Sequence, residues 1–455
     1  MKNVLFPLPL TPFERYYWAD NRPDYPTTFP IELSFFGTLN EPAFRAAVLA
    51  AQGRHPLLTA RIDDQGVDPR WVATEKPEPP IDWAAEGEPI RYPGDAPINL
   101  RVQVGLRVWA RPGVAKSLAR FEFHHASCDG LAAIQFVSDF LVCYANACAG
   151  EGAIATLAEL VPERLLERGS LSVDNPEPPS LKTAARDSWV TARLWIGILV
   201  QRCALLAAPR GPADVAARVG PSERIIEFET RVLVPSEAEQ LRAAANSQGV
   251  TVNDLLTRDL LAVLKDWNQS HGEPGGRRLR ISVPVNIRCS LDRDMPAANR
   301  IGFGFVEPEP RDFRDRATLL AAVRRQMDQI KQWKLGLYFL GGLAFASQFK
   351  SLIPWALHRN RSFATMVLSN LGRIFAKTPL PRREGRLICG DVELERLTGV
   401  PPIRPLTRGS FAIFEYAGEF AICLRCDPKL FRPRDCGELV DAYADRLRET
   451  ARLGA

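Results

Sequence analysis

The sequence FEFHHASCDG, which spans Phe121–Gly130, places two adjacent histidines directly after an apolar run. The whole chain has only five histidines in 455 residues, so a neighbouring pair is a distinctive feature. Leu118–Phe123 is read as the end of a strand, and the apolar residues of Leu131–Ala147 recur at helical spacing, which predicts that the pair lies at a strand-to-helix turn. Because adjacent side chains on an extended segment point to opposite faces, we expect the two histidines to have different roles.

The chemistry of this pair has several readings from residue types alone. An imidazole with an unperturbed pKa of about 6.5 is a suitable general base for a hydroxyl, thiol or amine at neutral pH. A metal site would need more ligands than the neighbouring Cys128 supplies, Cys128 could instead be a nucleophile activated by a histidine, and both histidines could be core residues satisfied by backbone hydrogen bonds. Asp129 could pair with a distant arginine and hold the turn, and Gly130 allows a close backbone approach or a positive φ.

Composition and charge place the chain among ordinary globular proteins. Hydrophobic residues make up 46% of the chain and charged residues 24%, so disorder is not expected. A length of 455 residues is too much for one ordinary core and predicts two domains. The net charge of +5 and the pI of 8.7 come without a long Lys/Arg block, which fits an anionic small substrate or a membrane surface and does not indicate nucleic acid.

Cysteine usage and the N-terminal sequence indicate a cytoplasmic protein. The nine cysteines include one C-x-x-C pair, Cys423 and Cys426, which lies in strand-like sequence without a second pair or a nearby histidine and is read as structural. An odd cysteine count without a secretion signal favours reduced thiols. No segment has the uncharged length needed to span a bilayer. Two shorter apolar stretches, Leu194–Val200 and Leu335–Phe349, are expected in a core or against a lipid-like ligand, so association with a membrane stays open.

Proline-rich segments divide the chain into two halves. NPEPPS at residues 175–180 and the Pro-, Gly- and Ala-rich Pro209–Pro221 bracket a helix-like segment, Asp187–Ala207. We therefore predict a first unit over residues 1–175, a bridging segment over 176–221 and a second unit over 222–455.

Strands and helices are mixed through both units, which predicts an α/β fold built on two sheets. The predicted strands are Ile31–Phe36, a half-buried Leu100–Ala110, Arg224–Val234, Leu279–Val285, Phe363–Leu368 and a hairpin over Ser410–Asp427 that turns at Ala417 and Gly418. The predicted helices are Glu41–Gln52, a segment that begins at Pro235, Val250–Trp267, Arg311–Trp333 and Asp435–Arg452.

The heptapeptide HHASCDG resembles the HHxxxDG motif of the CoA-dependent acyltransferase superfamily. That group includes nonribosomal-peptide condensation domains, polyketide-associated acyltransferases, wax ester synthase/diacylglycerol acyltransferases, plant BAHD acyltransferases and chloramphenicol acetyltransferase. The DFGWG motif of the plant enzymes is absent. The resemblance extends in the expected order through LTPFERYYW at residues 10–18, Phe44–Ile62, GVTVNDLL at residues 249–256, PVNIR at Pro284–Arg288 with Asn299 downstream, and SNLG at Ser369–Gly372.

The resemblance implies two chloramphenicol-acetyltransferase-like subdomains in a V-shaped pseudo-dimer with a central tunnel, and the first unit would carry HHxxxDG. It implies an acyltransferase for acyl groups other than aminoacyl groups, of the kind found in lipid or secondary metabolism. The donor substrate would be the CoA thioester of acyl-CoA or the phosphopantetheine thioester of an acyl-carrier protein, and the acceptor a hydroxyl- or amine-bearing small molecule or lipid. No covalent acyl-enzyme, permanently bound cofactor or metal is expected.

The same resemblance implies roles for individual residues. His125 would be the general base, and His124 would be structural. Asp129 would form a salt bridge with Arg288 that holds the loop, and Gly130 would keep the tunnel open. Candidates for substrate or oxyanion contacts are Asn299 and Ser369. Basic residues that could meet a donor phosphate are Arg277, Arg278, Arg382 and Arg383.

Two other functions stay open. The chain shows no carrier-protein or adenylation segment, which favours a stand-alone enzyme, but a condensation-type catalyst that forms an amide on carrier-bound substrates would use the same motif. A non-catalytic binding member of the same fold is the other alternative, and the intact HHxxxDG argues against it.

Overall fold

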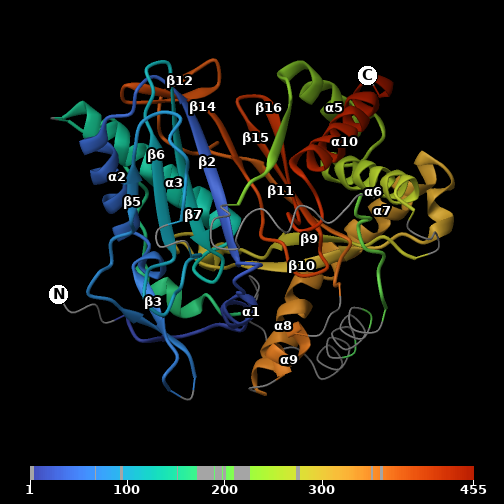
Figure 1. Ribbon diagram of the computed structural model, residues 1–455, viewed down its shortest axis with the longest axis horizontal. Helices are drawn as coiled ribbons and strands as arrows, with labels where there is room; N and C mark the ends of the chain where they lie inside the picture. Colours follow the sequence, from blue (N-terminus) through green and yellow to red (C-terminus); the bar gives the residue numbers. More distant parts are fainter. Residues whose placement is uncertain are drawn as a thin grey trace.

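Two large β-sheets with helices packed on them organise the chain, the first on the left and the second on the right of Figure 1. The computed structural model describes residues 5–66, 68–92, 96–150, 152–171, 189, 197, 201–209, 226–272, 277–349, 352–358 and 362–454. Strands and helices are mixed in both halves, as the sequence predicted.

The first sheet has seven strands, and one of its central strands leads into the histidine motif. β2 (Thr28–Phe36) pairs antiparallel with β7 (Lys116–His124), which ends at the first histidine. α2 (Glu41–Gly53) and α3 (Gly130–Ala149) cover one face of the sheet and share a core with it. The strand order is β12 (Arg382–Arg383), β13 (Arg386–Cys389), β14 (Val392–Gly399), β2, β7, β6 (Leu106–Arg111) and β5 (Ile81–Trp83).

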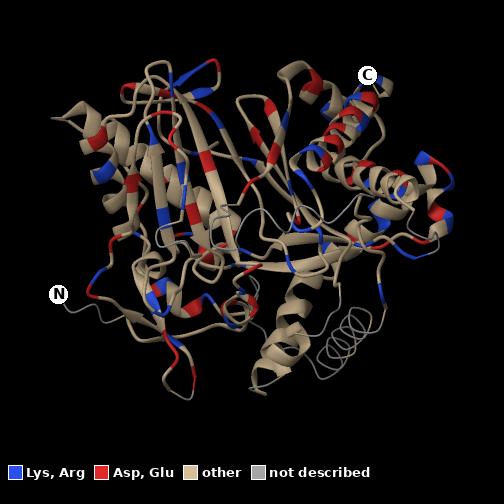
Figure 2. Cartoon of the chain, in the orientation of Figure 1, with Lys and Arg blue, Asp and Glu red and all other residues tan. Residues whose placement is uncertain are grey.

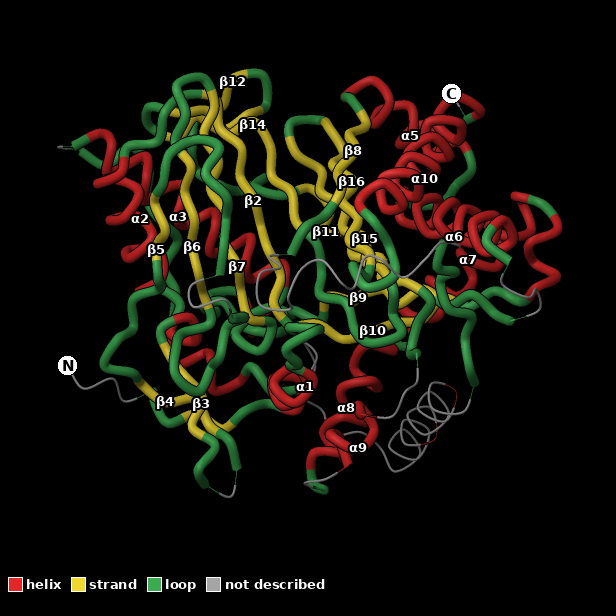
Figure 3. Tube along the Cα trace, viewed as in Figure 1, coloured by secondary structure: helices red, strands yellow, loops and turns green. Residues whose placement is uncertain are grey.

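The second sheet has six strands, all from residues beyond 228, and Figure 3 shows helices gathered on its outer side. Its order is β10 (Ile301–Val306), β9 (Ile281–Asn286), β11 (Met366–Arg373), β15 (Gly409–Tyr416), β16 (Glu419–Cys426) and β8 (Glu229–Leu233). The helices that share a second core with it are α5 (Pro235–Ser247), α6 (Val252–Ser270), α7 (Arg316–Gln332) and α10 (Pro433–Leu453).

A third apolar cluster joins the two halves around α1 (Pro12–Asp20). Thr11 caps this helix, because its side chain accepts a hydrogen bond from the Glu14 main chain while the Glu14 carboxylate accepts one from the Thr11 main chain. α1 packs against α8 (Leu335–Ser347) and α9 (Leu352–His358), so an element of the first half contacts elements of the second. The cluster also includes the small sheet β1 (Leu8–Pro9), β4 (Arg70–Ala73) and β3 (Ala60–Asp63).

Strands from the second half of the chain complete the first sheet. β14 pairs antiparallel with β2, with Gly399 opposite Ile31. Gly399 is required there, because a Cβ atom would lie 2.5 Å from the carbonyl oxygen of Pro30. Residues 382–399 therefore lie in the first sheet, although they fall within the range predicted for the second unit.

The predicted half-buried strand Leu100–Ala110 is wrong in its first half. The chain forms a turn up to Gly105, and Val102 within it is 73% exposed. The Asn99 side chain accepts a hydrogen bond from the main chain of Arg101, and the Asn99 carbonyl accepts from that of Val102, which favours the turn over a ladder. Only β6 is strand, and all of its residues are buried.

Three further predictions concern the hairpin near the C-terminus, the helix between the two halves and the absence of a membrane-spanning segment. The hairpin of β15 and β16 is confirmed, with Ala417 at φ 49° and Gly418 at φ 85°, as a tight turn between twisted strands requires. The predicted helix Asp187–Ala207 lies mostly outside the described residues, and residues 201–209 have no regular structure. Among the described residues, α3 is long and apolar enough to cross a bilayer, but its apolar side chains belong to the first core, which marks a core helix.

Candidate active site

The two histidines lie at the junction of β7 and α3, so the predicted strand-to-helix turn is confirmed. The main-chain N–H of His124 donates to the Gly105 carbonyl at 2.9 Å, and that of His125 donates to the Thr27 carbonyl at 2.8 Å. Gly105 has no room for a side chain, because a Cβ atom there would lie 2.0 Å from Oγ of Ser127. Main-chain hydrogen bonds to Gly105 and Thr27 therefore fix the position of the turn.

His124 is completely buried and uses its ring to hold the turn. Its Nδ1 accepts a hydrogen bond from the Ala126 main chain at 3.1 Å, which requires a neutral ring with the proton on Nε2. Nε2 lies 3.5 Å from Oγ1 of Thr27, whose hydroxyl donates to the Tyr17 carbonyl at 3.0 Å. Burial, with a smaller contribution from His125, lowers the pKa of His124 to about 3. These contacts favour a structural role.

His125 is 6% exposed and lies against two aromatic rings. The Tyr17 ring stacks on it with centroids 3.8 Å apart and planes 9° apart, and the Phe29 ring is tilted against it at 5.0 Å. Burial lowers the pKa of His125 to about 4, and the opposing effects of its own carbonyl, Asp129 and Asn299 are smaller. The buried Nδ1 has no hydrogen-bond partner of good geometry in the described part of the chain. The ring is therefore neutral at pH 7, the form that a general base requires.

The Asp129 carboxylate is fully buried and ties the two halves together. It caps α3, because Oδ1 accepts a hydrogen bond from the Ala132 main chain at 2.9 Å. Oδ1 also accepts from the guanidinium of Arg288 at 2.9 Å, and Oδ2 accepts from the main-chain N–H of Arg300 at 2.7 Å. The contact between Asp129 and Arg288 that the resemblance implied is thus present, and Arg300 adds a second bond from the same half.

Asn299 is buried beneath the turn. Its Nδ2 donates to the carbonyls of His125 and Ala126, each at 2.9 Å, so both N–H groups are occupied. An oxyanion contact from Asn299 would require one of these hydrogen bonds to break, and the geometry favours a bracing role.

Gly130 meets the second sheet directly. A Cβ atom on Gly130 would lie 3.0 Å from Cδ2 of Leu371 on β11, and Gly130 does not have a positive φ. Of the two reasons that the sequence offered for this glycine, the close approach therefore applies. Ser369 lies two residues earlier on β11, half-buried and paired with Ala412, and its predicted substrate contact stays a prediction.

The alternative chemistries at the motif find no support in this geometry. Cys128 is completely buried, and burial together with Asp129 raises the pKa of its thiol well above the usual range, which makes it a poor nucleophile. Within the described ranges, no three His, Cys, Asp or Glu side chains gather where they could hold a metal ion. Cys423 and Cys426 belong to different apolar clusters, the first and the second, which fits a structural interpretation.

Three residues that matter at the site, Tyr17, Thr27 and Arg300, had no role in the sequence analysis, and one role of Asp129 was not predicted either. The N-cap role of Asp129 had a signal, because Asp precedes Gly and an apolar helical run. Tyr17 lies in LTPFERYYW, but nothing in that segment indicates a ring stacked on a histidine more than a hundred residues away. Thr27 and Arg300 act largely through main-chain atoms, which leave no mark on a residue pattern.

Comparison with solved structures defines the fold. A variant of the starter condensation domain of rhizomide synthetase RzmA, in complex with C8-CoA, aligns with a TM-score of 0.66 and 14% identity over 98% of this chain and 95% of that one. The first condensation domain of the CDA synthetase aligns with a TM-score of 0.66 and 15% identity, over 98% and 96%. The chain therefore has the condensation-domain fold, and the predicted α/β class with two chloramphenicol-acetyltransferase-like subdomains is confirmed.

Among individual proteins, the chain is similar to polyketide synthase associated protein 5 from Mycobacterium tuberculosis, with a TM-score of 0.65 and 14% identity over 98% of this chain and 99% of that one. Two curated proteins of the same species, the uncharacterized proteins MT2362 of strain CDC 1551 / Oshkosh and Rv2305 of strain ATCC 25618 / H37Rv, are each 26% identical over 386 residues, 81% of this chain and 83% of theirs. No family model matches the chain.

Proposed function

We propose that the protein is an acyltransferase that moves an acyl group from a thioester donor to a hydroxyl or amine, with His125 as the general base. One observation carries the proposal: the neutral His125 ring, stacked on Tyr17, is held at the end of β7 by hydrogen bonds that come from both halves of the chain. The fold shared with a condensation domain that binds C8-CoA supports a CoA or phosphopantetheine thioester as donor.

The reaction needs two proton transfers, one from the acceptor to His125 and one from His125 to the departing thiolate. As the acceptor attacks the thioester carbonyl, its O–H or N–H proton passes to His125. The oxyanion then collapses, the C–S bond breaks and the imidazolium returns the proton to the departing thiolate, so no acyl-enzyme forms. A pKa of about 4 keeps the ring unprotonated beforehand and makes the imidazolium a strong donor to the sulfur. Such a positioned base contributes roughly 10²–10⁴-fold to the rate.

Substrates would reach His125 through the junction of the two halves. The turn meets α1 at Tyr17 and β11 at Leu371, so elements of both subdomains border it. We propose that donor and acceptor enter from opposite sides of a tunnel, and that the 6% of His125 that is exposed faces this tunnel.

The experiment that tests the function is mass spectrometry of products. The purified protein is incubated with acyl-CoAs of several chain lengths, and separately with acyl-carrier proteins, in the presence of mixed alcohols and amines. An ester or amide that appears only with active protein supports the proposal. Amide formed only from carrier-bound substrates would instead favour the condensation-type alternative, which the fold of the CDA synthetase domain supports. No product and no thioester hydrolysis would favour a non-catalytic binding protein.

We also propose that the protein is cytoplasmic and contacts a membrane surface through α8. Phe345 is 60% exposed, Phe349 52% and Trp333 51%, although such rings are normally buried. Figure 2 shows α8 and α9 without a charged residue, and the sequence has no Asp or Glu between Asp328 and Glu384. Exposed aromatic rings with lysines and arginines nearby fit a surface of anionic lipid.

Co-sedimentation with vesicles tests this contact. We expect more binding to phosphatidylcholine vesicles that contain phosphatidylglycerol than to phosphatidylcholine alone, and less binding for Phe345→Ser. Val114→Ser is the control, because Val114 is an apolar residue on a loop of the first half that is more exposed than Phe345, at 91% against 60%. Equal binding of both variants and the wild-type protein would contradict the contact.

A further inference from the structure

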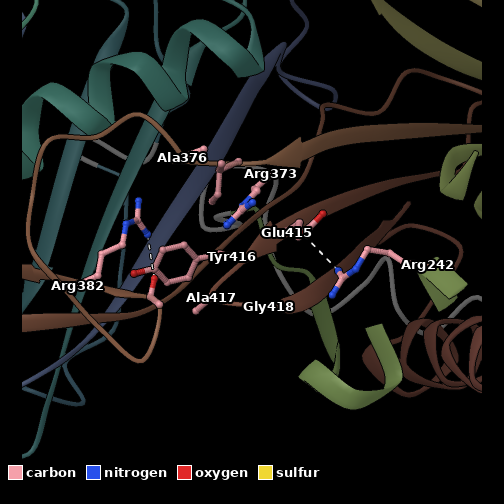
Figure 4. Close-up of a pocket in the computed structure, with 10 residues that line it drawn as sticks. Arg242, Arg373, Ala376, Arg382, Glu415, Tyr416, Ala417 and Gly418 are labelled. Carbon is pink, nitrogen blue, oxygen red and sulfur yellow. Dashed lines mark hydrogen bonds and ion pairs between the residues drawn. The ribbon is translucent and has the colours of Figure 1, made fainter. Parts of the chain in front are cut away.

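A cavity of about 490 Å³ opens between the two halves at the far end of β11 (Figure 4). It lies beside the turn of the β15–β16 hairpin, and strand β12, the turn between β12 and β13, and helix α5 contribute to its walls. The residues that line it are Arg242, Arg373, Ile374, Ala376, Arg382, Gly385, Glu415, Tyr416, Ala417 and Gly418.

The charge in this cavity is strongly positive. Three arginines line it against one acidic residue, Glu415, whose carboxylate pairs with Arg242 at 3.2 Å. Arg373 pairs with Glu415 in the β11–β15 ladder, but its side chain makes no hydrogen bond or ion pair with another described residue. The guanidinium of Arg382 is held by the carbonyls of Phe375 and Gly385, the second at 2.9 Å, and so is positioned by main chain without being neutralised. Arg373 and Arg382 therefore have no ion-pair partner among the described residues.

The walls of the cavity are fixed by hydrogen bonds across the two halves. The Tyr416 hydroxyl donates to the carbonyl of Leu394 at 3.1 Å and accepts from the main chain of Leu387 at 2.7 Å, which locks the hairpin to the strands that cross into the first sheet. Such a site is formed before a ligand arrives, which lowers the entropic cost of binding.

The cavity lies on the strand that also touches the histidine turn. The Leu371 side chain meets Gly130 at the start of α3, and Arg373 follows two residues later. Between them Gly372 has φ 63° and its N–H donates to the Asn370 side chain, where the β11 register shifts. This irregularity sets the direction in which Arg373 leaves the strand. The cavity and the histidine turn therefore both lie next to β11.

We propose that this arginine pocket, defined by Arg242, Arg373 and Arg382, binds a phosphate of the thioester donor. The proposal rests on the proposed function and deepens it. A phosphate group is common to CoA and to the phosphopantetheine of a carrier protein, and arginine binds phosphate oxygens through paired N–H groups. With the phosphate held here, the pantetheine arm would extend along β11 toward His125.

The structure separates the four arginines that sequence alone left equivalent. Arg382 lines the pocket, whereas its neighbour Arg383 pairs with Glu393 at 3.4 Å and does not line it. Arg278 lies near Glu309 at 3.8 Å, and neither Arg278 nor Arg277 lines the pocket. Arg383 is therefore a matched control for Arg382.

The test compares two thioesters with the same acyl group. One is the acyl-CoA, and the other is the acyl-N-acetylcysteamine, which has the thioester and no phosphate. In Arg373→Ala and Arg382→Ala, the ratio of KM for acyl-CoA to KM for acyl-N-acetylcysteamine should rise about tenfold or more, because charge-assisted hydrogen bonds are lost. Arg383→Ala should leave that ratio unchanged. An unchanged ratio in Arg373→Ala, or an equal rise in Arg383→Ala, would overturn the pocket.

Direct binding separates this proposal from the function. Calorimetry with CoA and with 4′-phosphopantetheine should show binding that weakens about tenfold in Arg373→Gln, whether or not turnover is found. Binding of CoA alone would indicate the nucleotide phosphates of CoA as the ligand, and equal binding of both would indicate the phosphate that carriers share. If turnover is present and neither compound's affinity depends on Arg373, the pocket is wrong and the function stands. Absence of turnover with every thioester removes the function instead.

Discussion

The histidine turn, residues 124–130, and the arginine pocket use polar side chains in opposite ways. His124, His125 and Asp129 are buried, and main-chain groups from both halves hydrogen-bond to the turn. In the pocket, Arg373 and Arg382 are exposed, and the Arg373 side chain has no hydrogen-bond or ion-pair partner among the described residues. Burial sets the chemistry of the turn, and charge sets that of the pocket. Changes in the turn should therefore alter stability and pKa values, and changes in the pocket should alter anion affinity.

The largest effect on stability is expected from Asp129→Ala. The variant loses the cap of α3 and two further hydrogen bonds to a buried carboxylate, which together are worth about 3–5 kcal/mol of unfolding free energy. Urea unfolding measures this loss. Asp315→Ala is the control, because Asp315 caps α7 in the same way but is exposed, and its loss should be clearly smaller. Similar losses in the two variants would remove the distinction between the buried and the exposed cap.

Acid should destabilise the protein through its buried histidines. The pKa values of His55, His124 and His125 are lowered by burial, the last two to about 3 and about 4, so below about pH 6.5 the unfolded chain takes up protons before the folded one. The unfolding free energy should then fall as pH drops from 6.5 toward 4, by up to about 1.4 kcal/mol per pH unit for each histidine.

The unfolding free energy in urea is measured at about pH 7.5, 6.5 and 5.5, values that bracket the ordinary histidine pKa of about 6.5. His124→Asn should flatten the dependence, because the amide can accept from Ala126 and takes up no proton. Stability that is constant or rises toward pH 5.5 would show that these rings are not held neutral.

Substitution of Tyr17 should change the pKa of the His125 ring more than it changes the position of that ring. Tyr17→Leu removes the ring that covers one face of the imidazole, so water should reach it and the pKa should rise from about 4 toward its ordinary value. The acid limb of the pH profile of kcat/KM, which reports the free enzyme, should move upward by about one unit. Tyr17→Phe keeps the stack and should leave the limb where it is. An unmoved limb in Tyr17→Leu would mean that the stack does not set the pKa.

The smallest effect on stability is expected in the pocket. The Arg373 side chain has no hydrogen-bond or ion-pair partner among the described residues, so Arg373→Ala should change the unfolding free energy by no more than about 0.5 kcal/mol. Thermal unfolding of the variant beside Asp129→Ala measures both ends of the comparison. A large loss in Arg373→Ala would mean that the pocket, like the turn, has a structural role.

The fold followed from sequence where periodicity and motif agreed. Apolar spacing predicted a helix over Val250–Trp267 capped by Thr251 or Asn253, and the structure has it at Val252–Ser270 with Thr251 as the cap. The β15–β16 hairpin was predicted from Ala417 and Gly418. The strand predicted at Leu100–Gly105 was wrong, because apolar and polar residues alternate in this turn as they would in a half-buried strand. The pairing of β14 with β2 joins segments more than three hundred residues apart, and no local pattern carries that information.

The candidate site could also be predicted only in part from the sequence. The Asp129–Arg288 contact came from the resemblance, since nothing in a single sequence links residues so far apart. The stacking of Tyr17 on His125 and the arginine pocket arise only when distant elements meet. Arg382 and Arg383 could not be told apart by composition, yet on a strand they face opposite sides, and only Arg382 reaches the pocket.

The central claim is that the neutral ring of His125 takes the acceptor's proton. Its most direct test is single-turnover formation of product from acyl-CoA and the acceptor found by mass spectrometry, for the wild-type protein and for His125→Ala, with unfolding midpoints measured alongside. The account predicts a rate lower by roughly 10²–10⁴-fold in a variant that still folds. A folded His125→Ala protein that forms product within about threefold of the wild-type rate would contradict it, because that is far less than a positioned base contributes.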